Sequence, residues 1–255
     1  MTEQDGARIV TAAILVIGDE ILSGRTKDKN IGYIAEYLTN IGIDLREVRV
    51  VPDEEAEIVS ALNALRTRYT YLFTTGGIGP THDDITADCV AKAFGVSIDV
   101  DERAKAMLLE RIKPEDLNEA RLRMARIPAG ATLIENGISK APGFRIGNVI
   151  VMAGVPSIMQ YMLDVVAPTL QTGVRMMSET LEAGNLPEGT YASPLAEVAK
   201  QFPGVSIGSY PSVTPTGFRN QIVLRSKDAA TLAAALDAVR AMLARLQAGS
   251  SQPSA

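Results

Sequence analysis

The chain has 255 residues, of which 46% are hydrophobic and 22% are charged, and its mean hydropathy is +0.10. That length suits one large domain or a medium domain with a small one, at roughly 100–200 residues per domain. A single cysteine (Cys89) and a single histidine (His82) exclude an intrachain disulfide, a cysteine-rich zinc site and any site with two histidine ligands. Chemistry by this chain is therefore expected to use carboxylates and hard cations.

The charge balance bears on the partners of the chain. Its 25 basic and 30 acidic residues give a formal net charge of −5, and no basic run is interleaved with aromatic residues, so nucleic acid is not expected as a partner. The longest apolar run near the start, residues 9–18, is too short to span a membrane. Glu3 and Asp5 precede this run and no small-residue cleavage site follows it, unlike in a signal peptide. We expect a cytoplasmic protein without a membrane partner, in which Cys89 is a reduced, structural thiol.

Strands and helices are expected to alternate in the first part of the chain. Residues 9–17 are apolar on both faces, as in a strand that is covered on both sides of a parallel sheet, and a loop over 18–24 follows. Helical spacing then predicts a helix that ends at about Gly42. The cycle recurs with strands at 43–51 and 71–75 and helices at 56–65 and 84–94. This alternation predicts right-handed crossovers in an open parallel sheet.

The later pattern predicts a second domain. Residues 101–127 are amphipathic and helical with an interruption at Pro114, and Pro156 is well placed to begin a helix that ends near 170. Further strands are expected at 133–134, 149–152, 174–181, 205–210 and 221–225, with helices at 194–202 and 229–246. The fold class is therefore α/β: a three-layer, doubly wound, mostly parallel sheet over residues 8–172, then a small α/β domain over 173–247 and a disordered tail over 248–255.

Ligands of open parallel sheets bind outside the carboxyl ends of the strands. The loops over 18–30, 52–55 and 75–86 fall at that edge, and the third contains Gly76, Gly77 and Gly79, followed by Asp83 and Asp84. Glycines let backbone amides approach an anion closely, and the start of a helix adds favourable partial charge. The plainer alternative is that these glycines make a tight turn and that one of the two aspartates caps a helix.

Electrostatic magnitudes favour a cation at this loop. A helix terminus contributes roughly 0.3–1 kcal/mol toward an anion. A carboxylate about 4 Å from a phosphate costs on the order of 4 kcal/mol at an effective dielectric constant near 20. If Asp83 and Asp84 share the loop with a phosphate, a cation must lie between them. Oxygen ligands without histidine suggest Mg²⁺ or Mn²⁺.

The segment Thr75-Gly-Gly-Ile-Gly-Pro-Thr-His-Asp-Asp-Ile-Thr86 resembles the signature of the molybdopterin-binding (MoaB/Mog-like) domain. The doubled aspartate is similar to the branch found at the N-terminus of competence/damage-inducible protein A (CinA). Four further motifs match that branch in order: 17–24 with Asn30, Asn136 with 141–144, 153–156 with Met159, and 207–211 in the small domain. The resemblance covers about residues 10–246.

The chain departs from the CinA pattern at two places. Ser139-Lys140 stands where the family usually has Gly-Thr, and Ala153 begins a motif that commonly begins with proline. The sequence ends at residue 255, so we expect no amidohydrolase domain of the kind that full-length CinA carries, and no nicotinamide-nucleotide deamidation.

The resemblance implies a role for particular residues. It implies that Asp84, with Asp53 as the second acidic position, holds a divalent metal (Mg²⁺, or else Mn²⁺ or Co²⁺). Asp84, Asp83, Glu20 and Lys140 are the expected catalytic residues. The residues expected to bind substrate or phosphate are Gly18, Asp19, Ser23, Asn30, Thr75, Gly76, Gly77, Gly79, Thr81, Thr86 and Asn136. Asp53 is also a good helix cap on sequence alone.

Three functions follow as hypotheses. The first is a metal-dependent pyrophosphatase that acts on an ADP-ribose-like nucleotide, with Asp83 or Glu20 orienting the attacking water and Lys140 stabilising phosphate charge. The second is molybdopterin binding or adenylyl transfer in molybdenum cofactor biosynthesis. The third is a non-catalytic, regulatory nucleotide-binding module. A nucleotide or pterin is thus the expected partner, and the chain is expected to form a homo-oligomer. His82 is expected to shape the pocket or to touch the ligand without acting as the catalytic base.

Overall fold

A computed structural model describes residues 9–214 and 217–250. The chain divides into two compact units between Gly173 and Val174, one residue after the boundary expected from the sequence. Among the described residues, no helix combines the length and the apolar character needed to cross a membrane.

The first unit is built on a six-stranded sheet in the order β2-β1-β3-β8-β7-β6. Four of these strands pair with one another in parallel: β1 (Val10–Ile17), β2 (Ile43–Val51), β3 (Tyr71–Thr75) and β8 (Val149–Met152). Strands β7 (Gly143–Ile146) and β6 (Thr132–Ile134) continue the sheet in antiparallel pairing. The expected α/β class with a mostly parallel sheet is therefore confirmed.

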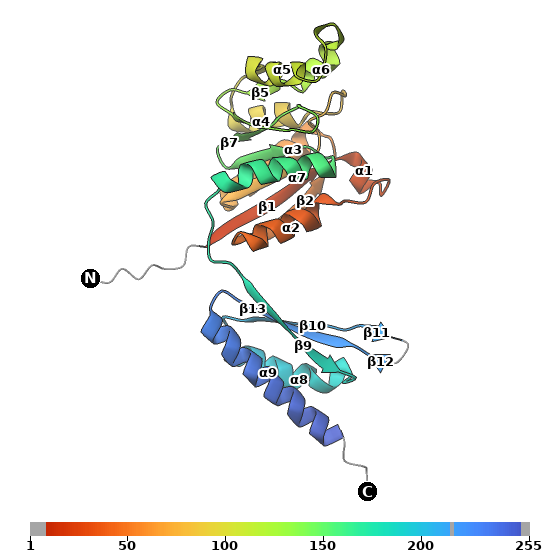
Figure 1. Cartoon of the computed structure of the whole chain (residues 1–255), viewed down its shortest axis with the longest axis vertical. Coiled ribbons are helices and arrows are strands. Elements are labelled where there is room, and N and C mark those ends of the chain that lie inside the picture. The colour runs from red at the N-terminus through yellow and green to blue at the C-terminus, as the bar shows by residue number, and fades with distance from the viewer. Residues whose placement is uncertain (1–8, 215–216, 251–255) are drawn as a thin grey trace, which may run out of the picture. The chain divides into compact units, whose positions relative to one another are not determined.

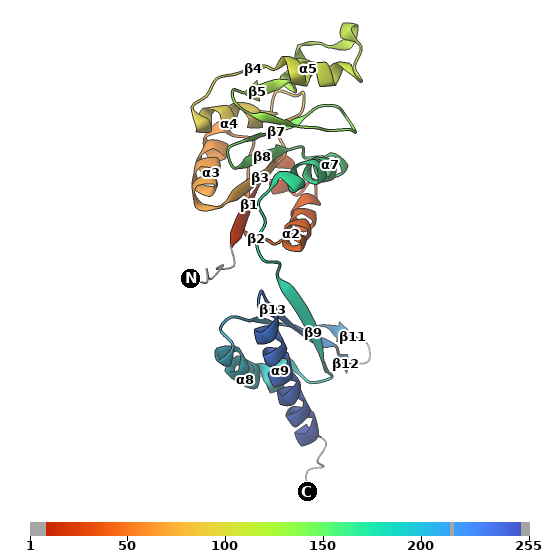
Figure 2. The same cartoon turned by 60° about the vertical axis from the view of Figure 1, so that its left-hand side comes forward.

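Helices cover both faces of this sheet, which makes three layers (Figures 1 and 2). Helices α3 (Glu55–Arg68) and α4 (Thr86–Phe94) pack with Leu15 and its alternate neighbours of β1 on one face. Helices α2 (Asn30–Asn40) and α7 (Pro156–Val166) pack with Ile14 and its alternate neighbours on the other. Strand β1 is buried on both faces, which explains why its sequence is apolar throughout.

Four expectations about the first unit are wrong in detail. Residues Asp19–Leu22 form a short helix, α1, where a loop was expected, and residues 143–146 form strand β7, which was not among the expected strands. The segment 101–127 is not one interrupted helix. It contains α5 (Glu102–Leu109), a 3-10 turn at Pro114–Asp116 and α6 (Glu119–Arg123). Strand β5 (Arg126–Pro128) follows and pairs with β4 (Ile98–Val100). The Asn118 side chain accepts the Arg121 amide and begins α6 anew, which separates it from α5. Helix α7 gives way to a 3-10 turn at Ala167–Thr169.

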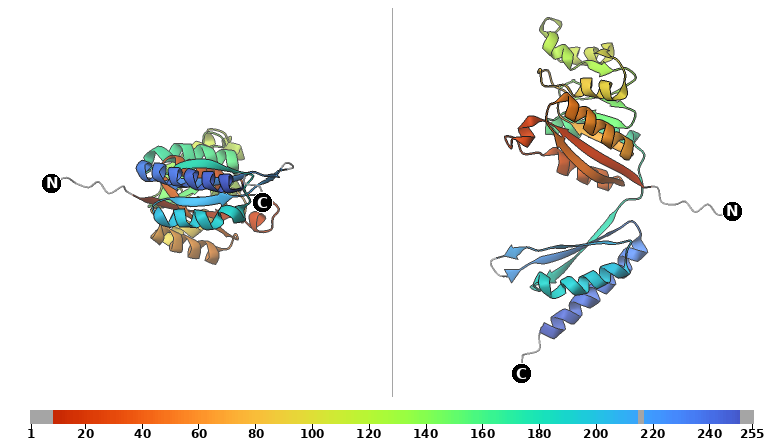
Figure 3. Two further views of the ribbon diagram at one scale, coloured as in Figure 1. Left: turned by 90° about the horizontal axis from the view of Figure 1, so that it is seen from below. Right: turned by 180° about the vertical axis from the view of Figure 1, so that it is seen from behind.

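The second unit has a three-stranded antiparallel sheet in the order β10-β13-β9, and helices α8 and α9 pack on one side of it (Figure 3). Its elements are β9 (Met177–Gly184), α8 (Glu188–Gln201), β10 (Ser206–Tyr210), β11 (Val213–Thr214), β12 (Gly217–Phe218), β13 (Asn220–Ser226) and α9 (Ala229–Ser250).

Two helix boundaries in this unit differ from the expected ones. Helix α8 begins before Pro194 and includes it, because Tyr191, Leu195 and Val198 bury one face of the helix and offset the lost hydrogen bond. Helix α9 continues to Ser250, so residues 248–250 are helical where a tail was expected, and residues 251–255 lie outside the described part.

Candidate functional site

The loops that follow β1, β2 and β3 meet at the carboxyl edge of the sheet, around a cavity of about 430 Å³. Each loop contributes carboxylates or glycines to the cavity wall: Gly18 and Glu20 from the first, Asp53 from the second, and Gly76–Gly79, Asp83 and Asp84 from the third. Segments after β6 and β8 close the cavity. Residues that are far apart in the sequence therefore form one concave site.

The segment 75–79, called the glycine loop below, needs glycine for steric reasons at two positions. Gly76 has a φ of +108°, and a Cβ atom there would lie 2.1 Å from the main-chain oxygen of Ile17. Gly77 has a φ of +67°, and its Cβ would lie 2.2 Å from Oγ1 of Thr86. The buried Thr86 hydroxyl donates to the main-chain oxygen of Gly76 at 3.0 Å. Close packing thus holds this backbone against β1 and the start of α4.

The Asp84 carboxylate lies against the glycine loop. Its Oδ2 accepts hydrogen bonds from the Thr81 amide at 2.8 Å and the Thr81 hydroxyl at 2.6 Å. A Cβ atom on Gly79 would lie 2.6 Å from the same oxygen. Neither Asp83 nor Asp84 caps α4, whose cap position is Ile85 without a side-chain hydrogen bond. Asp84 is therefore ordered by its own turn and not by the helix.

Asp53 links the first two loops. Its Oδ2 accepts the Asp19 amide at 2.9 Å, and this amide begins α1. Helix α3, which Asp53 was expected to cap, has Glu54 at its cap position and no side-chain hydrogen bond there. Burial, together with the negative charges of Asp19, Glu20 and Asp83, holds the pKa of Asp53 above its ordinary value, although the Asp19 amide partly opposes the shift. This carboxylate is thus repelled by its neighbours, and a cation would relieve the repulsion.

A smaller pocket of about 210 Å³ adjoins the main cavity and shares Ile17, Glu20, Gly76 and Gly154 with it. Buried Asn30 lines this pocket and donates from Nδ2 to Oγ1 of Thr75 and to the main-chain oxygen of Gly154, both at 2.8 Å. The Thr75 hydroxyl in turn donates to the main-chain oxygen of Ala153 at 2.9 Å. These bonds tie α2 and β3 to the segment after β8.

Asn136 and Lys140 lie on a turn that Asn136 itself organises. Its Oδ1 accepts the amides of Ile138 and Ser139, and its Nδ2 donates to the main-chain oxygen of Ala141 at 3.0 Å. Lys140 is the single non-glycine residue with positive φ (+65°) among the described residues, and its Nζ forms an ion pair with Glu110 at 2.5 Å. Asn136 faces the main cavity, whereas Lys140 lines neither pocket.

The structure gathers most of the residues singled out in the sequence. The main cavity is lined by Gly18, Glu20, Asp53, Gly76, Gly77, Gly79, Asp83, Asp84 and Asn136, and the smaller one by Asn30 and Thr75. Five others line neither of the two: Asp19, Ser23, Thr81, Thr86 and Lys140. Of these, Asp19, Thr81 and Thr86 support the site through the hydrogen bonds above. His82 is 97% exposed and lines neither pocket.

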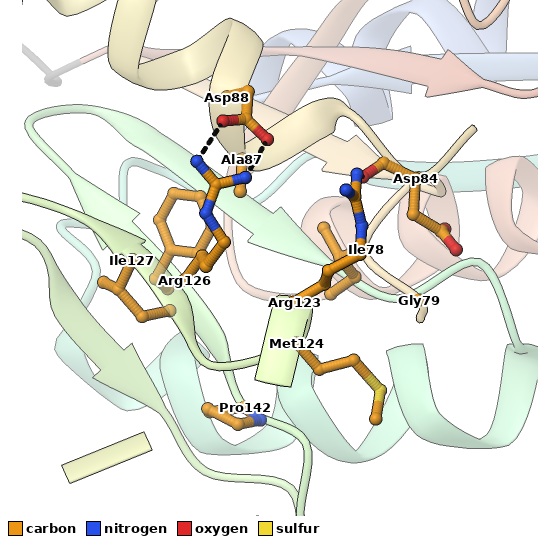
Figure 4. Close-up of a pocket in the computed structure, with 12 residues that line it drawn as sticks. Ile78, Gly79, Asp84, Ala87, Asp88, Arg123, Met124, Arg126, Ile127 and Pro142 are labelled. Carbon is orange, nitrogen blue, oxygen red and sulfur yellow. Dashed lines mark hydrogen bonds and ion pairs between the residues drawn. The ribbon is translucent and has the colours of Figure 1, made fainter. Parts of the chain in front are cut away.

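Two parts of the cavity wall had no expected binding role. Ala153, Gly154 and Val155 line it, and they belong to the 153–156 motif directly after strand β8, a position that could have indicated this. Met124 also lines it, and beside it Arg123 approaches Gly79 and Asp84 from α6 (Figure 4). No sequence motif marks this second part. Helix α6 lies between α5 and β5, and the fold of this segment brings it to the site.

Within the described residues, no group of three or more histidine, cysteine, aspartate or glutamate side chains is placed to hold a metal ion. A site made by protein ligands alone is therefore not built here. Asp53 and Asp84 do line one cavity and offer only oxygen atoms. This fits Mg²⁺, which is commonly bound by one or two carboxylates and completes its coordination with substrate phosphates and water.

Comparison with known proteins agrees with this geometry. Residues 13–172 match the family described as "Probable molybdopterin binding domain", and residues 175–249 match that described as "FAD synthase, middle domain". The chain belongs to the molybdopterin-binding-domain family, with a region like the FAD synthase middle domain after it.

Individual relatives support the CinA-like branch. The structure of the protein CinA from Thermoplasma acidophilum, of unknown function, is 35% identical, with a TM-score of 0.60 over 63% of this chain and 98% of that one. Protein Ta0487 of the same organism is 32% identical over 209 residues, which are 78% of this chain and 80% of the relative. A "Probable FAD synthase" of Caenorhabditis elegans is 31% identical over 92% of this chain, which spans half of that protein's length.

Proposed function

We propose that this chain is a metal-dependent pyrophosphatase that cleaves the phosphoanhydride of an ADP-ribose-like nucleotide. The observation that supports it most is the meeting of Glu20, Asp53, Asp83 and Asp84 with the glycine loop around one cavity of about 430 Å³. Pockets for small-molecule ligands commonly have volumes of about 300–1,000 Å³, so a nucleotide fits this space.

Different residues of the chain would have different roles in such a reaction. The glycine loop would offer backbone amides to phosphate oxygens. Lys140, which pairs with Glu110 and lines neither pocket, would add positive charge on leaving that pair. Asp83 or Glu20 orients a water toward phosphorus. The Thr81 hydroxyl and the Asp83 amide hold the pKa of the Asp83 carboxyl below its usual value, so this group stays ionised and accepts hydrogen bonds near neutral pH.

Asp53 and Asp84 are the residues that would hold a divalent ion. The ion would polarise a phosphoryl oxygen and lower the pKa of bound water. Asp53 suits this role because burial and three neighbouring carboxylates raise its pKa, and a cation opposes both effects. Asp84 suits it because the hydrogen bonds from Thr81 fix its carboxylate beside Gly79.

The likeness to FAD synthase extends the proposed substrate class to FAD, because FAD and ADP-ribose share an AMP unit joined through a pyrophosphate. Cleavage of either compound by water breaks one P–O–P link and releases AMP with a second phosphate monoester. The reaction is therefore the same at phosphorus, and the substrates differ in the group beyond the second phosphate.

The test is to incubate the purified chain with ADP-ribose or FAD in Mg²⁺, Mn²⁺, Co²⁺ or excess EDTA and to measure AMP by chromatography. We expect AMP with at least one divalent ion, none in EDTA, and a loss of at least about 100-fold in Asp84→Ala. The variant Asp99→Ala, on the surface strand β4, is the matched control. Full activity of Asp84→Ala, or no release with any of the ions, would contradict the proposal.

A second candidate is pterin binding, which the name of the matched family favours. Mass spectrometry of the ligand released from freshly purified protein distinguishes the two. A retained pterin without cleavage of ADP-ribose or FAD would favour molybdopterin binding. Nucleotide binding without turnover in any of the ions would favour a regulatory module.

A further inference from the structure

Arg123 is the last residue of α6 and lies beside the glycine loop. It lines a small pocket together with Gly77, Gly79 and Asp84, all of which also line the main cavity (Figure 4). The pocket lined by Arg123 and the main cavity therefore share part of their walls.

The hydrogen bonding of Arg123 is incomplete. Its Nη2 donates to the main-chain oxygen of Asp84 at 3.3 Å, which is long for such a bond. Its Nε is buried and has no hydrogen-bond partner among the described residues. A buried donor without a partner costs free energy, so this arrangement is unfavourable unless something else uses the group.

Arg126, three residues later, shows how an arginine in this region is satisfied. Its Nη1 and Nη2 bond to the two carboxylate oxygens of Asp88 at 2.9 and 2.7 Å (Figure 4). Such paired bonds use the planar, forked shape of the guanidinium. Arg123 has no comparable carboxylate partner in the described part of the chain, so its charge is available to a ligand.

The negative charges around the main cavity would favour a nearby positive charge when phosphate binds. Four carboxylates line it, those of Glu20, Asp53, Asp83 and Asp84, and no lysine or arginine is among the residues that line it. A phosphate bound to the glycine loop would meet this negative field. Arg123 lines the adjoining small pocket with Gly77 and Gly79 of this loop, and its Nη2 donates to the main-chain oxygen of Asp84.

We propose that Arg123 binds an oxygen of a phosphate group seated on the glycine loop, and so contributes to recognition of a nucleoside diphosphate. The inference rests on the proposed function for the identity of the loop as a phosphate site. On binding, a guanidinium N–H exchanges its long contact with the Asp84 carbonyl for a charge-assisted hydrogen bond to phosphate, which is the stronger of the two.

The experiment is calorimetric titration of the non-hydrolysable analogue α,β-methylene-ADP, called ADP below, in Mg²⁺ into the full chain and into Arg123→Gln, Arg123→Lys and Arg121→Gln. Arg121 lies on the same helix, donates to the main-chain oxygen of Asp116 and lines neither the small nor the main pocket, so it controls for loss of charge. We expect Arg123→Gln to weaken ADP binding by about 10- to 100-fold, the size expected for a hydrogen bond to a charged group. The ADP affinity of Arg123→Lys should lie between those of the wild type and Arg123→Gln. The ADP affinity of Arg121→Gln should remain within about twofold of the wild type.

A second titration separates phosphate binding from mere support of the loop. With Mn²⁺ alone, Arg123→Gln should bind as well as the wild type or better, because a positive charge near the carboxylates is removed. Hydrogen exchange of the Asp84 and Thr86 amides should also be unchanged. Equal ADP binding by Arg123→Gln and the wild type would overturn the inference, as would no saturable ADP binding by the wild type. Faster exchange of these amides with parallel losses of ADP and Mn²⁺ binding would also overturn it.

These outcomes are distinct from those that test the activity. If ADP binds through Arg123 but ADP-ribose and FAD remain intact with every ion, the inference holds and the proposed hydrolysis is wrong. If both substrates are cleaved and Arg123→Gln binds ADP normally, the hydrolysis holds and the inference is wrong.

Discussion

Asp53 accepts a hydrogen bond from the main-chain amide of Asp19, 34 residues earlier in the chain, at 2.9 Å. The bond joins the loop after β2 to the first turn of α1, which begins the loop after β1. One carboxylate therefore anchors a helix terminus while it faces the acidic cavity, and substitutions can separate these two roles.

Asp53→Asn should keep an acceptor for the Asp19 amide and remove the charge, whereas Asp53→Ala should remove both. We expect the free energy of unfolding of Asp53→Ala to be about 1 kcal/mol lower than that of Asp53→Asn, as for the loss of a hydrogen bond at a helix start. Both should lower metal-dependent release of AMP by about 100-fold or more. Denaturation and turnover assays check this. Near-normal turnover of Asp53→Asn would exclude a metal-binding role.

The raised pKa of Asp53 gives a prediction for pH. Because the folded state holds the proton more tightly than the unfolded state, whose pKa is near 3.8, stability contributed by this group falls as pH rises from that value through the folded pKa. The stability of Asp53→Asn relative to the wild type should therefore increase over this interval and remain level above it. Urea denaturation at a series of pH values measures this difference. A relative stability that falls with rising pH would contradict the direction of the shift.

Gly76→Ala and Gly24→Ala form a matched pair, because both glycines have positive φ, of +108° and +72°. A Cβ atom at Gly24 meets nothing within 4 Å, while one at Gly76 would lie 2.1 Å from the Ile17 oxygen. We expect Gly24→Ala to cost about 1 kcal/mol of stability from backbone strain alone. Gly76→Ala should cost roughly 3 kcal/mol or more, because the overlap adds to the strain. Similar losses in the two variants, measured by chemical denaturation, would show that the glycine loop moves easily.

Variants of Lys140 and Glu110 can distinguish a structural role of their ion pair from the proposed catalytic role of Lys140. Lys140→Gln and Glu110→Gln both break the pair, but Lys140→Gln alone removes the positive charge proposed to act on phosphate. We expect turnover of ADP-ribose to fall by about 10-fold or more in Lys140→Gln and to stay within about twofold in Glu110→Gln. Equal effects of the two variants on turnover would assign the pair a structural role only.

Cys89 should be inert in the folded protein. It is fully buried in α4, and burial raises the pKa of its thiol to about 12. At pH 8 only about one molecule in 10⁴ would carry the thiolate, which is the reactive form. We expect no reaction with a thiol reagent under native conditions and one thiol per chain in denaturant. Rapid labelling of the native protein would contradict this.

Much of the architecture could be predicted because it rests on local patterns. Continuous apolar runs such as 10–17 indicate strands buried on both faces, and the glycines and carboxylates at the strand ends mark the binding edge before any contact is known. Residues 248–250 were predicted as part of a tail but are helical. The helix predicted to start at Pro194 begins earlier, because burial of one helix face outweighs a single unfavourable residue.

What the sequence by itself determined is thus the α/β class, the alternation of strands and helices in the first part of the chain, and the residue types at the site. Periodicity and strand-end loops can be read locally because they are properties of neighbouring residues. The tertiary structure decided which of these residues meet. It placed Asp53 on the first turn of α1, paired Lys140 with Glu110, and brought Arg123 to the glycine loop. Each of these contacts joins residues that are 30 or more positions apart in the chain, and local spacing carries no information about such pairs.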